Sequence, residues 1–136
     1  MVTLSYLAAV LVATMASSFT DWYFMGVLFH DKYMTHPEVW RIQPGDKKSE
    51  RLAIAWSTLV GLFCCAMFIH ICEHFGMLGW HEAIALALGA WLAVALPLLI
   101  TNGLFIRIHP LNTLAHSLGW LARLLISAVC AHLFLG

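Results

Sequence analysis

Four long apolar runs constrain this chain more than any other feature of its sequence. They cover residues 2–29, 52–72, 83–106 and 111–135. A helix needs about 20 apolar residues to cross a hydrocarbon core of about 30 Å, so each run is long enough to span a bilayer. With 62% hydrophobic and 10% charged residues, the chain also differs from soluble domains. The sequence therefore predicts an all-α integral membrane protein, an antiparallel four-helix bundle forming one transmembrane domain over residues 1–136.

The first run is 28 residues long. As a helix it would measure about 42 Å, which exceeds the core of a bilayer. It lacks the basic N-terminal region of a signal peptide, so we expect a retained and tilted span. Four of its residues recur at a spacing of four: Ala9, Ala13, Ser17 and Asp21. Small residues at this spacing let another helix approach closely, so Asp21 is predicted to point into the bundle and not toward lipid.

Residues 30–51 form the only substantial predicted loop. Pro37 is expected to open a short interfacial helix, because proline favours the first turn of a helix. The apolar residues of that helix would be Val39, Trp40 and Ile42. The proline-glycine pair at 44–45 predicts a turn, and Asp46 is expected to be the N-cap of the second span.

Basic residues are distributed unevenly between the two ends of the predicted bundle. Six of them fall in the long loop and in the turn after the third run: Lys32, Arg41, Lys47, Lys48, Arg51 and Arg107. The connection at residues 73–82 and both tails hold none. The positive-inside rule then predicts that the long loop is cytoplasmic and that both termini lie outside the cytoplasm, in a plasma or bacterial inner membrane.

Two charges are expected inside the bilayer, Asp21 in the first run and Arg123 in the fourth. At about 1.5 Å per residue, Asp21 lies about 12 Å and Arg123 about 18 Å in from the cytoplasmic ends of their helices. An unpaired charge at such a depth costs several kcal/mol. We therefore predict an Asp21–Arg123 ion pair that forms a polar core with His116 and Asn102. Such a pair would either only fix the register of the helices or belong to a solute or proton site. In the remaining alternative, Asp21 only reaches the interface, where Trp22 and Tyr23 form an aromatic belt.

Small residues at a spacing of four also occur in the third and fourth runs. They are Ala85, Gly89 and Ala93 in the third run, and Ala115, Gly119, Ser127 and Ala131, on the face of Arg123, in the fourth. Both stripes predict close contact with another helix. In the third run Pro97 also predicts a kink, since proline cannot complete the regular helical hydrogen bonds.

Histidines gather near the outer end of the predicted bundle: His70, His74, His81 and His132. The first two are one helical turn apart, which suits ligation of a divalent metal, with His81 or a carboxylate completing the shell. Haem is the alternative cofactor, with His70 or His74 opposite His132 as axial ligands, and His30 with His116 as a second pair. The simplest interpretation is that these histidines are interfacial and solvated.

Short motifs relate the chain to a known family. They are Trp22-Tyr23 followed by Leu28-Phe29, and the stretch from Pro97 to Phe105 with Arg107 just beyond. In these motifs, and in the apolar fourth run after a short turn, the whole chain resembles domain-of-unknown-function family 1761 of small membrane proteins. The resemblance implies four spans and no particular reaction.

The sequence also lacks several motifs that would indicate a particular activity. The sequence has no nucleophile elbow, phosphate-binding loop or dinucleotide fingerprint, and a net charge of zero gives no sign of nucleic-acid binding. We therefore expect a non-enzymatic membrane protein that either handles a small solute or ion or serves as an accessory subunit of a membrane assembly. Either function is compatible with a homo-oligomer or a larger membrane complex. The alternatives are a metal- or haem-binding subunit and a purely structural subunit.

Overall fold

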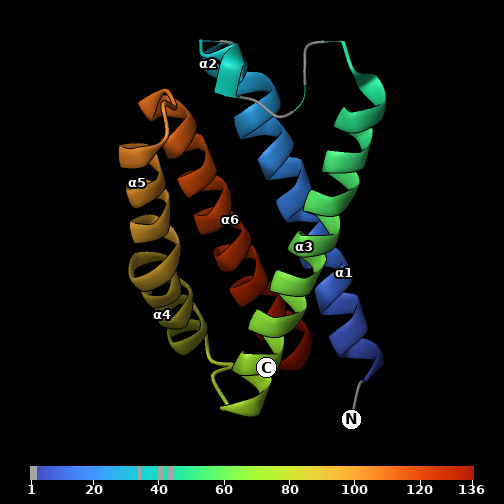
Figure 1. The fold of residues 1–136 in the computed structure, drawn as a ribbon. Helices are drawn as coiled ribbons and strands as arrows, with labels where there is room; N and C mark the ends of the chain where they lie inside the picture. Colours follow the sequence, from blue (N-terminus) through green and yellow to red (C-terminus); the bar gives the residue numbers. More distant parts are fainter. Residues whose placement is uncertain (1–2, 34, 40–41, 43–44) are drawn as a thin grey trace.

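All regular structure in the described part of the chain is helical, which confirms the predicted all-α class. The structure is a computed structural model that describes residues 3–33, 35–39, 42 and 45–136. Four of its helices are long and apolar enough to cross a membrane: Leu4–Leu28, Lys47–His74, Trp80–Phe105 and Pro110–Leu135. They form a bundle in which both chain ends lie at the end where the second of these helices turns into the third (Figure 1).

The first span changes its winding in its last third. Helix α1 (Leu4–Asp21) begins after Thr3, whose hydroxyl accepts a hydrogen bond from the Tyr6 amide. Directly after Asp21 the chain continues as a π-helix, η1 (Trp22–Leu28), and then as the short helix α2 (His30–Tyr33). The hydropathy pattern predicts one span here and does not predict the π-helix. Such segments are rare, and they occur frequently at functional sites.

The long loop contains one short turn of helix. The 3₁₀-helix η2 (Pro37–Val39) begins at the proline where a short helix was predicted. Trp40, Arg41 and Pro44, on which the rest of that prediction and part of the predicted turn depend, lie outside the described residues. Gly45 has a φ of +92°, a left-handed conformation that glycine adopts without strain.

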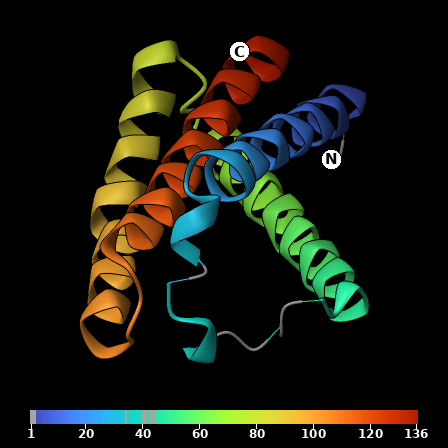
Figure 2. The same cartoon turned by 90° about the horizontal axis from the view of Figure 1, so that it is seen from above.

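Helix α3 (Lys47–His74) begins at the predicted N-cap, because the Asp46 carboxylate accepts a hydrogen bond of 3.1 Å from the Ser49 amide. This bonding to Ser49 holds the pKa of Asp46 below its usual value. All residues from 51 to 60 are exposed, and burial in α3 starts only at Gly61. Seen from above, this first half of α3 diverges from the other helices (Figure 2).

The third span consists of α4 (Trp80–Ala90), a π-helix η3 (Trp91–Ala95) and α5 (Leu96–Phe105). The π-helix lies just before Pro97, at the place where the sequence predicts a kink. Proline has no amide hydrogen and its ring conflicts with the carbonyl four residues earlier, so regular α-helical bonding is interrupted there.

The small-residue stripe of the third span does not pack within the chain. Ala85, Gly89 and Ala93 are all exposed, and a Cβ atom added to Gly89 would meet nothing within 4 Å. The prediction of a close helix contact through this stripe is therefore wrong for the single chain. Instead Ala83 and Ala87, on another face of α4, are fully buried.

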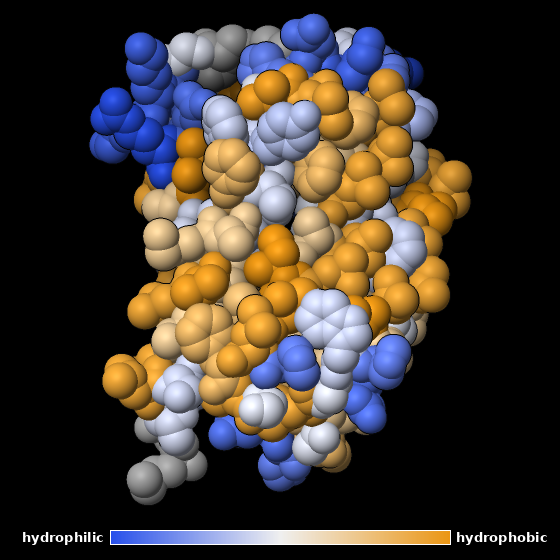
Figure 3. Space-filling model, turned by 180° about the vertical axis from the view of Figure 1, so that it is seen from behind, coloured by the Kyte–Doolittle hydropathy of each residue, from blue (hydrophilic) through white to orange (hydrophobic). Residues whose placement is uncertain are grey.

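Helix α6 (Pro110–Leu135) is the centre of the bundle and contacts α1, α3 and α4. Its predicted stripe is confirmed as a buried face: Ala115, Gly119, Arg123, Ser127 and Ala131 are all buried. The small residues of the α1 stripe, Ala9, Ala13 and Ser17, are buried as well. The outer surface is an apolar belt between hydrophilic groups at the two ends, as expected for a protein in lipid (Figure 3).

Candidate functional site

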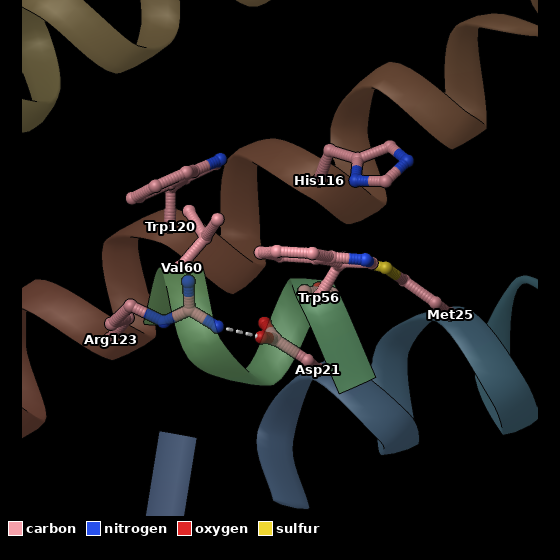
Figure 4. A pocket seen from close by; sticks show the side chains of 8 residues that line it. Asp21, Met25, Trp56, Val60, His116, Trp120 and Arg123 are labelled. Carbon is pink, nitrogen blue, oxygen red and sulfur yellow. Dashed lines mark hydrogen bonds and ion pairs between the residues drawn. The ribbon is translucent and has the colours of Figure 1, made fainter. Parts of the chain in front are cut away.

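An ion pair inside the bundle links the first and fourth spans. Arg123 of α6 donates from Nη2 to Oδ2 of Asp21, the last residue of α1 (Figure 4). Arg123 is only 6% exposed, so the pair is largely shielded from the surroundings. The structure thus brings together the two charges that the sequence places inside the bilayer.

Two glycines make room for this ion pair. A Cβ atom on Gly119 would lie 2.7 Å from Oδ1 of Asp21, and one on Gly61 would lie 3.0 Å from Cζ of Arg123. Gly119 belongs to the predicted stripe of α6, whereas Gly61 was missed. A glycine inside a helix costs about 1 kcal/mol relative to alanine, and this cost is the sequence signal that could have identified Gly61.

The guanidinium of Arg123 makes a further contact and has N–H donors that its bond to Asp21 does not use. Its Cζ atom lies 5.1 Å from the ring centroid of Trp120, a cation–π contact. Its Nε atom is buried and has no hydrogen-bond partner among the described residues. Because a guanidinium carries five N–H donors, Arg123 can hold Asp21 and still donate to another acceptor.

A cavity of about 270 Å³ lies beside the ion pair. It is lined by residues of α1, η1, α3 and α6: Asp21, Met25, Trp56, Ser57, Val60, His116, Trp120 and Arg123. Figure 4 shows the aromatic rings of Trp56, His116 and Trp120 grouped around one side of the pair. The α3 residues in this lining all belong to the segment that diverges from the bundle. The cavity therefore lies where that helix separates from α1 and α6.

The short helix α2 is hydrogen-bonded to α6 next to this cavity. The hydroxyl oxygen of Tyr33 lies 3.1 Å from Nε2 of His116, and Asn112 donates from Nδ2 to the Lys32 carbonyl at 3.1 Å. Burial, together with the negative charge of Asp21, raises the pKa of Tyr33 to about 12. The phenol therefore stays neutral at physiological pH and can keep its hydrogen bond to the imidazole.

The predicted polar core is only partly assembled. Asp21, Arg123 and His116 line the same cavity, but Asn102 is exposed on α5 and does not line it. The buried amide is that of Asn112, near the start of α6. Asn102 was predicted only as a nearby polar residue, and no spacing pattern indicated which face of its helix it occupies.

The predicted metal-binding histidines are only partly brought together. The rings of His70 and His74 lie 5.9 Å apart between centroids, and both residues are exposed, as is His81. The Nδ1 atom of His132 instead forms a 2.9 Å hydrogen bond with the Leu78 carbonyl, and its ring contacts Trp80. Within the described ranges, no three histidine, cysteine or acidic side chains form a group that could hold a metal ion.

Comparison with known proteins gives one match. Residues 8–132 match a family model described as Protein of unknown function (DUF1761), and this range includes every residue that lines the cavity. No curated protein and no solved structure matches the chain. The resemblance inferred from the short motifs is thereby confirmed.

Proposed function

Because the chain belongs to the DUF1761 family, whose function is unknown, its activity must be inferred from the site, and we propose that it handles a small solute or ion within the membrane. The solute would bind in the cavity beside Asp21 and Arg123. The observation that carries this proposal is the cavity beside a buried ion pair, where the guanidinium of Arg123 lines the cavity and has more N–H donors than its bond to Asp21 uses.

A purely structural ion pair would not need this arrangement. Membrane helices associate by close packing, so a cavity between them forgoes contacts that would otherwise stabilise the bundle. This cavity is also lined by charged, hydroxyl and imidazole groups, which are unfavourable in lipid unless they have polar partners. A bound solute would supply the missing contacts and an acceptor for the guanidinium of Arg123, which lines the cavity.

Under the proposed orientation the cavity would lie in the half of the bundle nearer the cytoplasm, because its α3 residues come from the segment next to the basic loop. Six lysines and arginines lie in the loop and turn at one end of the bundle, and both chain ends lie at the other end (Figure 1). The positive-inside rule places the basic end in the cytoplasm and the termini on the opposite side. A reporter fused to the C-terminus should therefore be inactive if it requires the cytoplasm. Cytoplasmic activity would overturn this orientation.

Solute flux into proteoliposomes tests the proposed function. We would measure the entry of glycerol, acetate and methylammonium into vesicles containing the full chain. Ser57→Trp should fill the cavity, because Ser57 lines it and lies on an exposed segment that tolerates a larger residue. Thr58→Trp is the matched control, since Thr58 is the next residue, is equally exposed and does not line the cavity.

The two tryptophan variants separate a binding cavity from a packing defect. At least one solute should enter faster than in protein-free vesicles, should return to the protein-free rate with Ser57→Trp and should be unaffected by Thr58→Trp. Equal rates for all three proteins with every solute would contradict solute handling through this cavity.

A role as an accessory subunit is the second candidate, supported by the exposed stripe of Ala85, Gly89 and Ala93. Small residues on an exposed face allow close approach of a helix from another membrane protein or another copy of this chain. Gly89→Leu should then abolish association in crosslinking experiments in native membranes. The matched variant Leu88→Ala, at an exposed residue beside the stripe, should leave association intact. Crosslinking that persists in Gly89→Leu would exclude this contact face.

A further inference from the structure

The charges that line the cavity restrict what it can bind. Among the described residues that line it, Asp21 is the one acidic residue and Arg123 the one arginine or lysine, and they pair with each other. With His116 counted as neutral, the lining therefore has no net charge. A ligand with a net charge would add an unpaired charge inside the membrane, which is strongly unfavourable. A ligand without net charge matches this balance.

The hydrogen-bonding groups demand both an acceptor and a donor from the ligand. The guanidinium of Arg123 lines the cavity and has more N–H donors than its bond to Asp21 uses, so it can donate to an acceptor on the ligand. The Asp21 carboxylate can only accept, and its side chain remains 21% exposed, so the ligand can reach it with a donor. An uncharged group that carries an acceptor beside a donor, such as an amide, can satisfy both residues at once.

The walls of the cavity favour a flat ligand. The indoles of Trp56 and Trp120 lie on the same side of the ion pair as the imidazole of His116 (Figure 4). Val60 and Met25 add apolar surface. Aromatic side chains pack well against planar rings, in stacked or edge-to-face arrangements.

We propose that the cavity binds an uncharged, planar aromatic molecule that carries a hydrogen-bond acceptor next to a donor. The acceptor would face Arg123, the donor would face Asp21 and the ring would pack against the two indoles. This inference rests on the proposed solute-handling function and adds the chemical class of the solute.

Three probes that share one ring test the inference: benzamide, benzoate and benzylammonium. Their Kd values would be measured by ligand-observed NMR with the full chain in lipid nanodiscs. Benzamide should bind about tenfold more tightly than either ion, because it adds no net charge inside the membrane. Trp56→Leu should weaken benzamide binding by about three- to tenfold through loss of one aromatic wall. Phe63→Ala, at a residue 67% exposed on the same helix, is the control and should leave the Kd unchanged.

Charge variants should change the preference in opposite directions. Asp21→Asn leaves Arg123 unbalanced, so benzoate should become the tightest of the three probes. Arg123→Gln leaves Asp21 unbalanced, so benzylammonium should become the tightest. The double variant Asp21→Asn/Arg123→Gln removes both charges and should restore the preference for benzamide. It also tests the inference if either single variant fails to fold.

The outcomes distinguish this inference from the proposed function. If benzoate or benzylammonium binds most tightly to the unmodified protein, the ligand class is wrong, whereas binding in the cavity stands. If none of the three probes binds while Ser57→Trp still blocks the flux of another solute, the aromatic class is wrong and solute handling stands. An unchanged order of the probes in both single variants would also overturn the charge argument.

Discussion

The two ends of the bundle are packed in different ways. Near the chain ends the helices are in close contact, and the buried residues there are mostly small or of moderate size: Ala9, Ala13, Cys65, Ile69, Cys72, Ala83, Ala87, Ala128 and Ala131. Toward the basic loop, α3 is exposed from residue 51 to residue 60, and the cavity lies beside the ion pair. We refer to these regions as the closed half and the open half.

The difference between the halves shows which residues allow helices to pack closely in lipid. Lipid tails are as apolar as leucine, so apolar side chains gain little by leaving them, and close approach depends on small residues. In α3 the buried positions begin at Gly61 and continue through Cys65 and Cys72. Before Gly61 the helix carries larger exposed side chains such as Trp56 and Leu59. The helix therefore diverges at the point where its small buried residues end.

The largest effect should come from breaking the ion pair that lies between the two halves. Arg123→Gln would leave the Asp21 carboxylate without its partner inside the membrane. Removal of one member of a buried pair typically costs about 3–5 kcal/mol. The free energy of unfolding in mixed micelles should fall by about this amount, and Asp21→Asn/Arg123→Gln should recover most of it. A loss below about 1 kcal/mol would mean that the pair is effectively solvated.

The same substitution should have different effects in the closed and open halves. Ala13→Leu places a large side chain at a fully buried position and should cost about 1–3 kcal/mol of stability by overpacking. Ala55→Leu makes the same change at an exposed position of α3 and should be nearly neutral. Thermal unfolding of both variants in detergent checks this comparison. Equal losses would show that this part of α3 is packed against other helices in the folded protein.

Two glycine substitutions should show how tightly the ion pair between the halves is packed. Gly119→Ala would place Cβ 2.7 Å from Oδ1 of Asp21, and the resulting displacement of the carboxylate should cost about 1 kcal/mol net of the helix propensity that alanine adds. Gly89→Ala is the control, because nothing lies within 4 Å of its added Cβ, and it should not destabilise the protein. Chemical denaturation would compare the two, and a stabilised Gly119→Ala variant would show that the pair has room to move.

The smallest effect should come from Tyr33→Phe, which removes the hydrogen bond to His116 and should cost about 0.5–1 kcal/mol. The folded-state pKa of Tyr33 is about 12, whereas the reference value is 10.0. The folded state therefore holds this proton more tightly than the unfolded state, and stability should be lost as pH rises from about 10 to about 12. Tyr33→Phe should reduce this loss in unfolding measurements between pH 9 and pH 12. An identical pH dependence in both proteins would show that Tyr33 is exposed to solvent.

Several features of the closed half could be predicted from the sequence. Hydropathy identifies helices long enough to span the membrane, and spacing of small residues identifies the buried faces of α1 and α6. The high cost of an isolated charge in lipid links Asp21 to Arg123. Each of these inferences depends on a local pattern or on a strong energetic penalty, so a single sequence is sufficient.

The open half was largely missed, for physical reasons. The cavity exists because α3 diverges from its neighbours, and no local pattern specifies the angle between two helices. The stripe at Ala85, Gly89 and Ala93 shows that a helix can be approached closely, but not which helix approaches it. No pattern indicated which face of its helix Asn102 occupies, and among the described residues Asn112 is the buried amide. The π-helices likewise have no signature in the hydropathy pattern.

The π-helix η1 has a consequence for how the first span can move. A π-helix accommodates additional residues in a turn, so its conversion to α-helical winding changes the register of everything beyond it. A change of one residue corresponds to about 100° of rotation and 1.5 Å of translation. Such a change would carry Tyr33 away from His116 while α1, and Asp21 at its end, stayed in place. The π-helix η1 therefore separates Asp21, which is paired with Arg123, from the short helix α2, which is hydrogen-bonded to α6.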